Sequence, residues 1–340
     1  MSAGCRNRSA VVILNWNGAD HLLKFLPSVV RHTPAEVDIL VADNGSTDRS
    51  LALLNEQFPS VKALLLHTNY GFAMGYNRAL AELEYENYIL LNSDVEVGEG
   101  WCAPLISALD SDPTLGAVGS KLRSYAERSK FEYAGASGGF IDILGYPFAR
   151  GRVLQSLEQD HGQYDDKREV FWVSGAAFAI RAERFREMGG FDEDFFAHME
   201  EIDLCWRLQI AGYRNMILPQ SVVYHLGGGT LSSTSPRKVM LNHRNNLSML
   251  YKCAPTWQRI LVAVVRPPLD FLAALSYLAK GQVASFLAVG RAYLDFILWH
   301  RALAKKRKKI RGSRKRESSQ IYRGSILFAY ILGRRNFSDL

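Results

Sequence analysis

The feature that most constrains the fold is an alternation of short apolar segments with amphipathic ones over residues 10–92. Apolar runs at 10–14, 37–42, 61–66 and 88–91 predict buried strands. The segments between them carry apolar residues at helical spacing, around 22–30, 50–57 and 72–83. Short strands that alternate with helices predict an α/β fold with a mostly parallel central sheet and helices on both of its faces.

Three of these strands end in polar turns, at residues 15–18, 43–48 and 92–94. A single turn of this kind is more often structural, because Asn, Asp and Gly favour turns for backbone reasons. Three turns on one edge favour a ligand site, because open α/β sheets bind ligands at the carboxyl ends of their strands. Asp94 at this edge suits a divalent cation that holds a diphosphate, since hard cations take oxygen ligands.

The charge of the chain is concentrated in one segment. Residues 301–316 contain ten Lys or Arg and no acid; removing these ten from the 41 basic residues leaves 31, against 34 acidic residues. A nucleic-acid-binding face spread over the folded domain is therefore disfavoured.

The four cysteines lie far apart without zinc spacing, which favours reduced thiols in a cytosolic protein, and the polar N-terminus predicts no signal peptide.

The second half of the chain is less regular. The Gly- and aromatic-rich residues 132–152 predict a loop or an irregular hairpin, and residues 171–180 and 217–225 predict strands. A helix is predicted from about Glu200 to Gly212, and the pattern is helical beyond about residue 235.

Adjacent carboxylates open the predicted helix at Glu200 and Glu201. Because neighbours on a helix point in different directions, one of them should face away from the core, where it could act as a general base. The alternative is a simple preference of acids for a helix start. Asp203 and Arg207, at i,i+4, predict a pair on the helix surface.

His225 closes a strand just before the glycine run 227–229. This position predicts a metal ligand followed by a mobile lid, against the alternative of a structural histidine and a flexible connector.

Lys238 and Arg244 follow and could reach phosphate oxygens, although surface cations are common. Residues 69–78 open a helix with two glycines, which would allow a ligand to approach a positive helix end.

Taken together, these segments resemble glycosyltransferase family 2, whose members have the GT-A fold. The resemblance covers roughly residues 9–250, in the family's order, and points to the rhamnosyltransferase-like subgroup that builds bacterial surface polysaccharides. The segments that carry it are 12–18, 41–48, 69–72, 90–94, 174–176, 189–193, 200–203 and His225.

The resemblance implies a role for each matching residue. The chain departs from the family pattern at Asn92, where a first metal-motif carboxylate is often found, and at Glu201, where Asp is usual. The implied nucleotide-binding residues are Asn15, Asp43, Asp48, Gly71, Asn77 and Ser93. The implied ligands of Mg²⁺ or Mn²⁺ are Asp94 and His225, the implied base is Glu201 with Glu200 beside it, and the implied neighbours of the donor sugar and acceptor are Gly175, Asp192 and Trp172.

Residues 251–340 predict amphipathic helices and a polybasic region. Two apolar stretches, 260–278 and 283–299, are long enough to approach a membrane span, but Arg266-Pro267-Pro268 and Asp270 interrupt the first, and Arg291 and Asp295 the second. Basic residues near an anionic lipid surface contribute about 1 kcal/mol each, and an apolar helix beside them is the two-signal pattern of peripheral binding. Packing on the catalytic domain is the alternative for the helices.

The sequence thus predicts a GT-A catalytic domain at 1–250 and a helical extension at the cytoplasmic face of the cell membrane. The expected activity is inverting transfer from a nucleotide-sugar donor to a glycan or lipid-linked acceptor, with no nucleic-acid partner. A nucleotidyltransferase would need a glycine-rich phosphate loop near the first strand, which residues 15–18 do not provide. An inactive sugar-nucleotide-binding module would not need Glu200, Glu201 and His225. The donor base, the sugar, the acceptor and the oligomeric state remain open.

Overall fold

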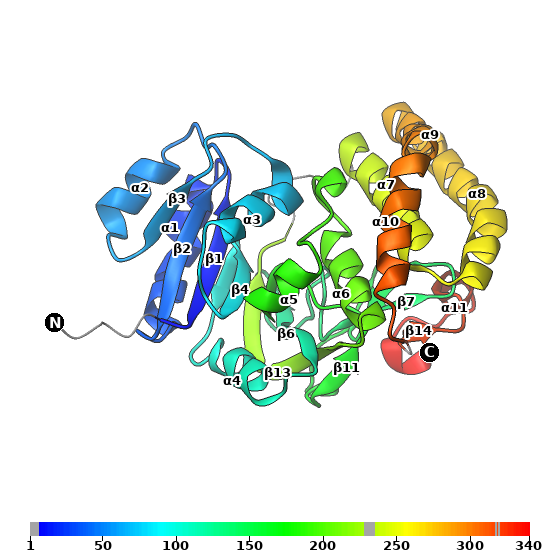
Figure 1. Cartoon of the computed structure of the whole chain (residues 1–340). Helices are drawn as coiled ribbons and strands as arrows, with labels where there is room; N and C mark the ends of the chain where they lie inside the picture. Colours follow the sequence, from blue (N-terminus) through cyan, green and yellow to red (C-terminus); the bar gives the residue numbers. More distant parts are fainter. Residues whose placement is uncertain (1–6, 228–234, 317, 319) are drawn as a thin grey trace.

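The computed structural model describes residues 7–227, 235–316, 318 and 320–340. The first six residues, which include Cys5, and the glycines 228–229 of the predicted lid lie outside the described residues. Figure 1 shows a sheet-based body that carries a group of C-terminal helices at one side.

The first half of the chain forms the predicted parallel sheet. Four strands pair in the order β4-β1-β2-β3, all parallel. They are β1 (Ser9–Asn15), β2 (Val37–Asp43), β3 (Lys62–Leu65) and β4 (Asn87–Asn92). The helices between them are α1 (Ala19–His32), α2 (Ser50–Gln57) and α3 (Gly71–Ala81). The alternation of strands and helices read from the sequence is therefore confirmed.

Helices cover both faces of this sheet because its strands alternate their side chains between two cores. Val12 and Leu90 join one core, with apolar residues of α3 and of α6 (Glu200–Ile210). Val11 and Ile89 join the other, with residues of α1 and α4 (Ala103–Ser111).

The sheet continues in the order β11-β13-β6-β12-β4, with β5 paired to β13. These strands are β5 (Val95–Val97), β6 (Leu115–Ser124), β11 (Arg168–Val170), β12 (Ala177–Arg181) and β13 (Arg214–His225). β12 is antiparallel to both β4 and β6, whereas β6 and β13 are parallel, so the sheet is mixed. The short helix α5 (Ala182–Glu187) follows β12.

The strand predicted over 171–180 is divided in the structure. Trp172 forms a bridge to Gly139 in another sheet, and β12 begins only at Ala177. Between them Ser174 turns the chain, because its hydroxyl donates to the carbonyl of Ala134 and accepts from the amide of Ala176.

A second, smaller sheet contains the hairpin predicted in the Gly- and aromatic-rich segment. Its order is β10-β9-β8-β7-β14. The strands are β7 (Gly139–Asp142), β8 (Pro147–Ala149), β9 (Arg152–Val153), β10 (Ser156–Leu157) and β14 (Ile321–Tyr322). β7 and β8 are antiparallel, and β14 returns from the far end of the chain to pair with β7 in parallel.

The C-terminal helices pack together beside α6 (Figure 1). They are α7 (Pro236–Cys253), α8 (Thr256–Ala279), α9 (Val283–Leu298) and α10 (His300–Gly312). The short helix α11 (Ile326–Ile331) lies by the small sheet, where the Ile326 amide donates to Asp142 of β7, and the 3₁₀ turns η1 (Glu193–Phe195) and η2 (Phe337–Asp339) complete the fold. The predicted domain boundary at 250/251 falls inside α7, and β14 belongs to the sheet of β7, so the extension is joined to the first 250 residues through a helix and a strand pairing.

Helix α8 runs without interruption through Pro267 and Pro268. Arg266 and Asp270, which appeared to break the apolar stretch, pair with each other on the inner side of the helix at 2% and 1% exposure. Arg266 also donates to the carbonyl of Leu144 and to Asn246. The charges within α8 therefore hold the helix to the protein and leave its outer side apolar.

Candidate active site

The ends of β1 and β2 meet as predicted, with Asn15 in register with Asp43. The Asn15 amide donates to Asp43 at 3.3 Å and to Ser46 at 3.2 Å, and both Asn15 and Asp43 are buried. The Oδ1 of Asn15 is buried without a hydrogen-bond partner. A buried acceptor without a partner is costly, so this strand end has the kind of unsatisfied group that a ligand donor can pair with.

Asp48 accepts hydrogen bonds from the starts of two helices at the same edge of the sheet. Its two carboxylate oxygens accept from the amides of Ala19 and Ser50, both at 3.0 Å, at the starts of α1 and α2. Burial raises the pKa of Asp48, but these hydrogen bonds outweigh burial and leave it below its usual value. Asp48 thus fixes two helix starts around the strand ends.

Gly71 and Asn77 hold a neighbouring turn in place. Gly71 has φ +78°, and a Cβ there would lie 2.5 Å from the ring of Phe196, so only glycine fits without strain. Asn77 donates to the carbonyl of Phe191 at 3.0 Å and accepts from its amide at 2.8 Å. Both residues secure the segment that leads to α6, through their contacts with Phe196 and Phe191.

Asn44, which was not singled out, ties the end of β2 to the start of α3. Its side chain accepts from the amide of Tyr70 at 3.1 Å and donates to the carbonyl of Gly71 at 3.0 Å. The sequence signal that could have identified Asn44 is its position in the polar turn 43–48.

The predicted metal ligands lie side by side. β5 pairs with β13 so that Val95 is opposite His225, which brings Asp94 Oδ1 to 3.2 Å from His225 Nε2. Both side chains are nearly buried, and Ser93 lies beside them in the turn that faces Gly18. Two residues from strands far apart in the sequence thus converge at one sheet edge.

Strong electrostatic coupling holds this pair. Burial raises the pKa of Asp94, but the hydrogen bond from His225 outweighs it, so the pKa lies below its usual value. Burial lowers the pKa of His225, but Asp94 and Glu132 outweigh it and raise the pKa to about 10. Glu132 Oε2 lies 3.3 Å from the other ring nitrogen, Nδ1. Glu132 escaped the sequence analysis because its segment has no periodic pattern.

A carboxylate and an imidazole make a small set of metal ligands. Among the described residues, no three His, Cys, Asp or Glu side chains converge as a metal site. Mg²⁺ is commonly held by one or two carboxylates together with substrate phosphates and water rather than by an all-protein cage. Asp94 and His225 therefore fit a cation that arrives with a diphosphate, and the missing carboxylate at Asn92 is compatible with that use.

Glu200 and Glu201 begin α6, as predicted. Each has an Oε2 atom that is buried without a hydrogen-bond partner. Burial raises the pKa of Glu201 to about 7, and burial together with the charge of Glu201 raises that of Glu200 well above its usual value. A carboxylate that titrates near neutral pH is suited to general-base catalysis.

Gly175 makes room beside Glu201. A Cβ on Gly175 would lie 3.6 Å from the Cβ and Cγ of Glu201 and 3.6 Å from the ring of Phe72. The predicted base and the predicted donor-sugar residue are therefore neighbours.

The segment that leads into α6 has an unusual backbone. Phe196, His198 and Met199 have φ of 59°, 72° and 72°, in the left-handed region that residues other than glycine rarely adopt. The side chain of Asn245 in α7 donates to the carbonyls of residues 195, 197 and 198, at 2.9, 2.9 and 2.8 Å. Strained backbone held in this way clusters at functional sites, and here it sets the direction of the two glutamates.

Two residues implied for the sugar or acceptor make buried contacts within the protein. Trp172 is 3% exposed, its indole N–H donates to the carbonyl of Phe140 at 3.0 Å, and its ring fills the space beside Gly139. Asp192 is buried and accepts from Lys252 and Lys306. Trp172 is thus a core residue, and Asp192 joins η1 to α7 and α10.

Burial and contact revise two further expectations and place a third residue near the metal pair. The Asp203–Arg207 pair forms at 2.7 Å, but in the core rather than on the surface, with side chains 0% and 9% exposed. Arg244 donates to the carbonyl of Asp194 and stacks on Trp299, which is a structural position. Half-buried Lys238 interacts electrostatically with Glu132, close to the metal pair.

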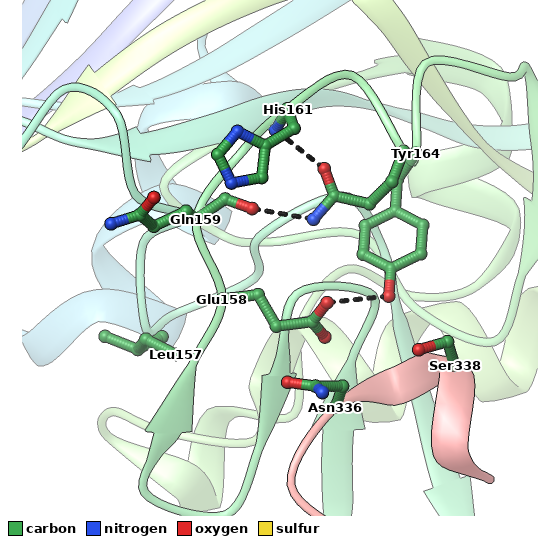
Figure 2. A pocket seen from close by; sticks show the side chains of 8 residues that line it. Leu157, Glu158, Gln159, His161, Tyr164, Asn336 and Ser338 are labelled. Carbon is green, nitrogen blue, oxygen red and sulfur yellow. Dashed lines mark hydrogen bonds between the residues drawn. The ribbon is translucent and has the colours of Figure 1, made fainter.

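An open cavity of about 580 Å³ lies elsewhere, between residues 157–164 and the C-terminal turn (Figure 2). Within it the Tyr164 hydroxyl donates to Glu158 at 2.9 Å. Its lining contains none of the residues that the sequence implied for the site.

Comparison with known proteins identifies the family of the chain. Residues 10–189 match the family model described as glycosyl transferase family 2. Over 264 residues the chain is 28% identical to the N-acetylglucosaminyl-diphospho-decaprenol L-rhamnosyltransferase of Mycobacterium tuberculosis, an alignment that covers 73% of this chain and 86% of that relative.

Solved structures of glycosyltransferases share the fold. The mannosyltransferase PcManGT of Pyrobaculum calidifontis, in complex with GDP-Man and Mn²⁺, superposes with a TM-score of 0.53 and 16% identity over 91% of this chain and 86% of that one. GalNAc-T7, with UDP, GalNAc and Mn²⁺, superposes with a TM-score of 0.56 and 18% identity over 73% of this chain and 48% of that one. These matches confirm the predicted GT-A fold class.

Proposed function

The chain belongs to glycosyl transferase family 2, and from that premise we propose that it is an inverting glycosyltransferase whose base is Glu201. The observation that carries the proposal is the placement of Glu201, a half-buried side chain beside Gly175 whose Oε2 atom is buried without a hydrogen-bond partner and whose pKa is raised to about 7. Such a group can accept the proton of an acceptor hydroxyl at neutral pH.

The reaction is a single displacement. Glu201 takes the proton from the acceptor hydroxyl as its oxygen attacks the anomeric carbon of the donor. The bond from that carbon to the diphosphate oxygen breaks, and attack from the opposite face inverts the configuration. Gly175 leaves space next to the base for the reacting groups.

Asp94 and His225 are the residues that would hold Mg²⁺ or Mn²⁺ on the diphosphate. When bound, such a cation supplies Lewis-acid stabilisation of the charge on the departing nucleoside diphosphate. Asn15 and Asp43 would contact the nucleoside from the ends of β1 and β2, where Asn15 Oδ1 lacks a partner. Asp48, Gly71 and Asn77 would support this pocket through the backbone contacts described above.

The name of the mycobacterial relative suggests the substrates. That relative is described as an L-rhamnosyltransferase acting on N-acetylglucosaminyl-diphospho-decaprenol. By analogy, we propose that this chain transfers rhamnose or another hexose to a lipid-linked or growing glycan in bacterial surface-polysaccharide synthesis.

A lipid-linked acceptor would place the enzyme at the cytoplasmic membrane surface, and α8 has a suitable face. It is the one helix among the described residues that is long and apolar enough to span a membrane, but with Arg266 and Asp270 turned inward we propose that it lies on the bilayer instead. Its large exposed apolar residues are Trp257, Ile260, Val264, Phe271, Leu272, Leu275 and Leu278.

Only some of the cations in the basic segment 301–316 are exposed and able to contact lipid. Arg307 is buried and donates to the carbonyls of residues 251, 252 and 254 at the end of α7, and Lys306 pairs with Asp192 and Asp194. The exposed cations of α10 are Arg301, Lys305, Lys308, Lys309 and Arg311. We propose that these assist the outer side of α8 on an anionic surface.

Vesicle co-sedimentation of the full chain tests the membrane contact. The double variant Phe271→Ser/Leu272→Ser should pellet less than the wild type with phosphatidylglycerol vesicles, because two exposed apolar side chains are lost from α8. Leu23→Ser, a change of equally exposed leucine on α1, is the control and should pellet like the wild type. Equal pelleting of all three proteins would reject α8 as the contact.

The activity is tested with nucleotide sugars. A thermal-shift screen of UDP-, dTDP- and GDP-sugars, with and without Mn²⁺, would identify the donor. Transfer of that donor to a short-chain polyprenyl-diphosphate N-acetylglucosamine acceptor should yield a product whose anomeric configuration, read by NMR, is opposite to that of the donor. Retention of configuration would overturn the single displacement, and donor hydrolysis without transfer to this or longer glycan acceptors would overturn the acceptor class.

A further inference from the structure

His225 lies between two carboxylates. Its Nε2 is 3.2 Å from Asp94 Oδ1, and its Nδ1 is 3.3 Å from Glu132 Oε2. Asp94 follows β4 at the sheet edge, whereas Glu132 comes from the irregular segment between β6 and β7. The resemblance of the sequence motifs implies a role for Asp94 and His225 but none for Glu132.

Glu132 is held firmly in this position. Its Oε2 also accepts from the amide of Ala134 at 2.5 Å, and its own amide donates to the carbonyl of Leu122 at 3.1 Å. The side chain is 8% exposed. Gly227 approaches closely enough that a Cβ there would lie 3.0 Å from Glu132 Oε1, and its φ of +71° favours glycine. A buried carboxylate fixed by the backbone is a rigid acceptor.

The chemistry of imidazole gives this contact a consequence. A neutral histidine binds a metal through one nitrogen only when its proton is on the other, and the partner of that second nitrogen decides the tautomer and the ring orientation. In this structure Nδ1 lies within reach of Glu132 Oε2 but makes no hydrogen bond. We propose that Glu132 is a positioning residue: it accepts a hydrogen bond from Nδ1–H when a diphosphate-bound cation lies beside Asp94, so that Nε2 carries the lone pair that binds the cation. This inference rests on the proposed function of the Asp94–His225 pair.

A structural role alone would predict something different. If Glu132 only stabilised its loop, its removal would change the free energy of unfolding but not the affinity for metal. If Glu132 orients His225, metal affinity should fall even in a well-folded variant, and an amide oxygen in its place should restore part of the affinity. Glu132→Ala and Glu132→Gln therefore form a graded pair.

The measurement is Mn²⁺ affinity, read by electron paramagnetic resonance of free Mn²⁺ in the presence of the nucleoside diphosphate selected by the thermal-shift screen. Loss of such a partner of a metal-bound histidine typically costs about 10–100-fold in affinity, and we expect Glu132→Ala to raise the Kd for Mn²⁺ by about that factor. Glu132→Gln should raise it less. Glu127→Gln is the matched control, because Glu127 is an exposed acid nearby that pairs with Lys130; its Kd should equal that of the wild type.

A second readout follows the imidazole directly. With ¹⁵N-labelled histidine and Mg²⁺ in place of Mn²⁺, the wild type should show His225 as the neutral tautomer protonated at Nδ1. Glu132→Ala should show a mixture of tautomers. If the alanine variant does not fold, the same spectrum of Glu132→Gln is recorded instead.

The outcomes separate this inference from the proposal on which it rests. Unchanged Mn²⁺ affinity in Asp94→Ala would mean that the metal site itself is misplaced. Weakened affinity in Asp94→Ala together with wild-type affinity in a folded Glu132→Ala would overturn the role of Glu132 alone.

Discussion

Two sets of buried carboxyl groups lie around the start of α6, and their surroundings are opposite. Glu200 and Glu201 have buried oxygens without partners, and their pKa values are raised. Asp203, in the same first turn of the helix, pairs with Lys252 at 2.8 Å and with Arg207, and Asp192 pairs with Lys252 and Lys306.

The difference shows what a partner does to a buried acid. Lys252 and Lys306 outweigh the effect of burial and hold the pKa of Asp192 below its usual value, so its charge is permanent and serves to fasten α7 and α10 to η1. Glu201 keeps its affinity for a proton because it has no cation, and this is the property that a base requires. Asp192 and Asp203, the paired set, therefore hold α6 in place. Glu200 and Glu201, the unpaired set, are available for catalysis.

The largest expected effect is on catalysis by the unpaired set. Glu201→Gln removes the base without changing its shape, and kcat should fall by about 10²- to 10⁴-fold. Nucleotide affinity, measured by calorimetry, should stay close to that of the wild type. Glu200→Gln is the comparison, since Glu200 is the neighbouring carboxyl group that also has a buried oxygen without a hydrogen-bond partner. If Glu200→Gln were the inactive variant instead, the base would be Glu200.

Breaking the paired set should affect stability instead. Lys252→Ala removes the cation that Asp192 and Asp203 share in the core and leaves Asp192 with Lys306 and Asp203 with Arg207. Removing one partner of a buried ion pair costs about 3–5 kcal/mol. Urea unfolding measures this loss. A loss below about 1 kcal/mol would mean that the pairs contribute little to holding α6, and the contrast between the two sets would not stand.

The pH dependence distinguishes the sets again. Since the pKa of Glu201 is raised to about 7, kcat/KM should rise about tenfold per pH unit below pH 7 and level off above it.

The contribution of Glu201 to the free energy of unfolding should change with pH in the opposite direction. The raised pKa means that the folded state binds the proton more tightly than the unfolded state, so this contribution is present below the ordinary Glu pKa of 4.5 and is lost as pH rises through 7. Glu201→Gln should remove that loss; an identical pH–stability curve for the variant would contradict the raised pKa.

The smallest effect is expected at the exposed edge of the paired set. The Lys306 side chain is 36% exposed and Asp192 keeps Lys252 as a partner, so Lys306→Ala should cost about 0–1 kcal/mol, as for other solvent-exposed pairs. High salt should weaken even this difference. A cost as large as that of Lys252→Ala would show that α10 is essential to the fold around η1.

The sequence located the parts of the site that depend on strand ends. The alternation of strands and helices brought Asp94 to the sheet edge, and the apolar run before His225 placed it there too; the structure puts the two side chains 3.2 Å apart. The start of α6 at Glu200 was also predicted, because acids and a terminal glycine mark the ends of a helix.

Other parts required the tertiary structure. Spacing predicted the Asp203–Arg207 pair but not its burial, because i,i+4 spacing does not say which side of a helix faces the core. Asp48, Gly71 and Asn77 have the residue types of a ligand loop, yet the same types are used for turns and helix starts. Nothing in the sequence distinguished Arg307 and Lys306 from the other cations of their run, and only contacts with the end of α7 and with Asp192 separate them.

The parallel pairing of β14 with β7 also bears on synthesis of the chain. Gly139–Asp142 leaves the ribosome long before Ile321–Tyr322, so one edge of β7 has no partner strand until the last part of the chain is made. An open strand edge is a template for pairing with another molecule, and distant pairings form slowly. The small sheet should therefore be the last part of the fold to close, and the nascent chain should be most prone to aggregate in the interval before it does.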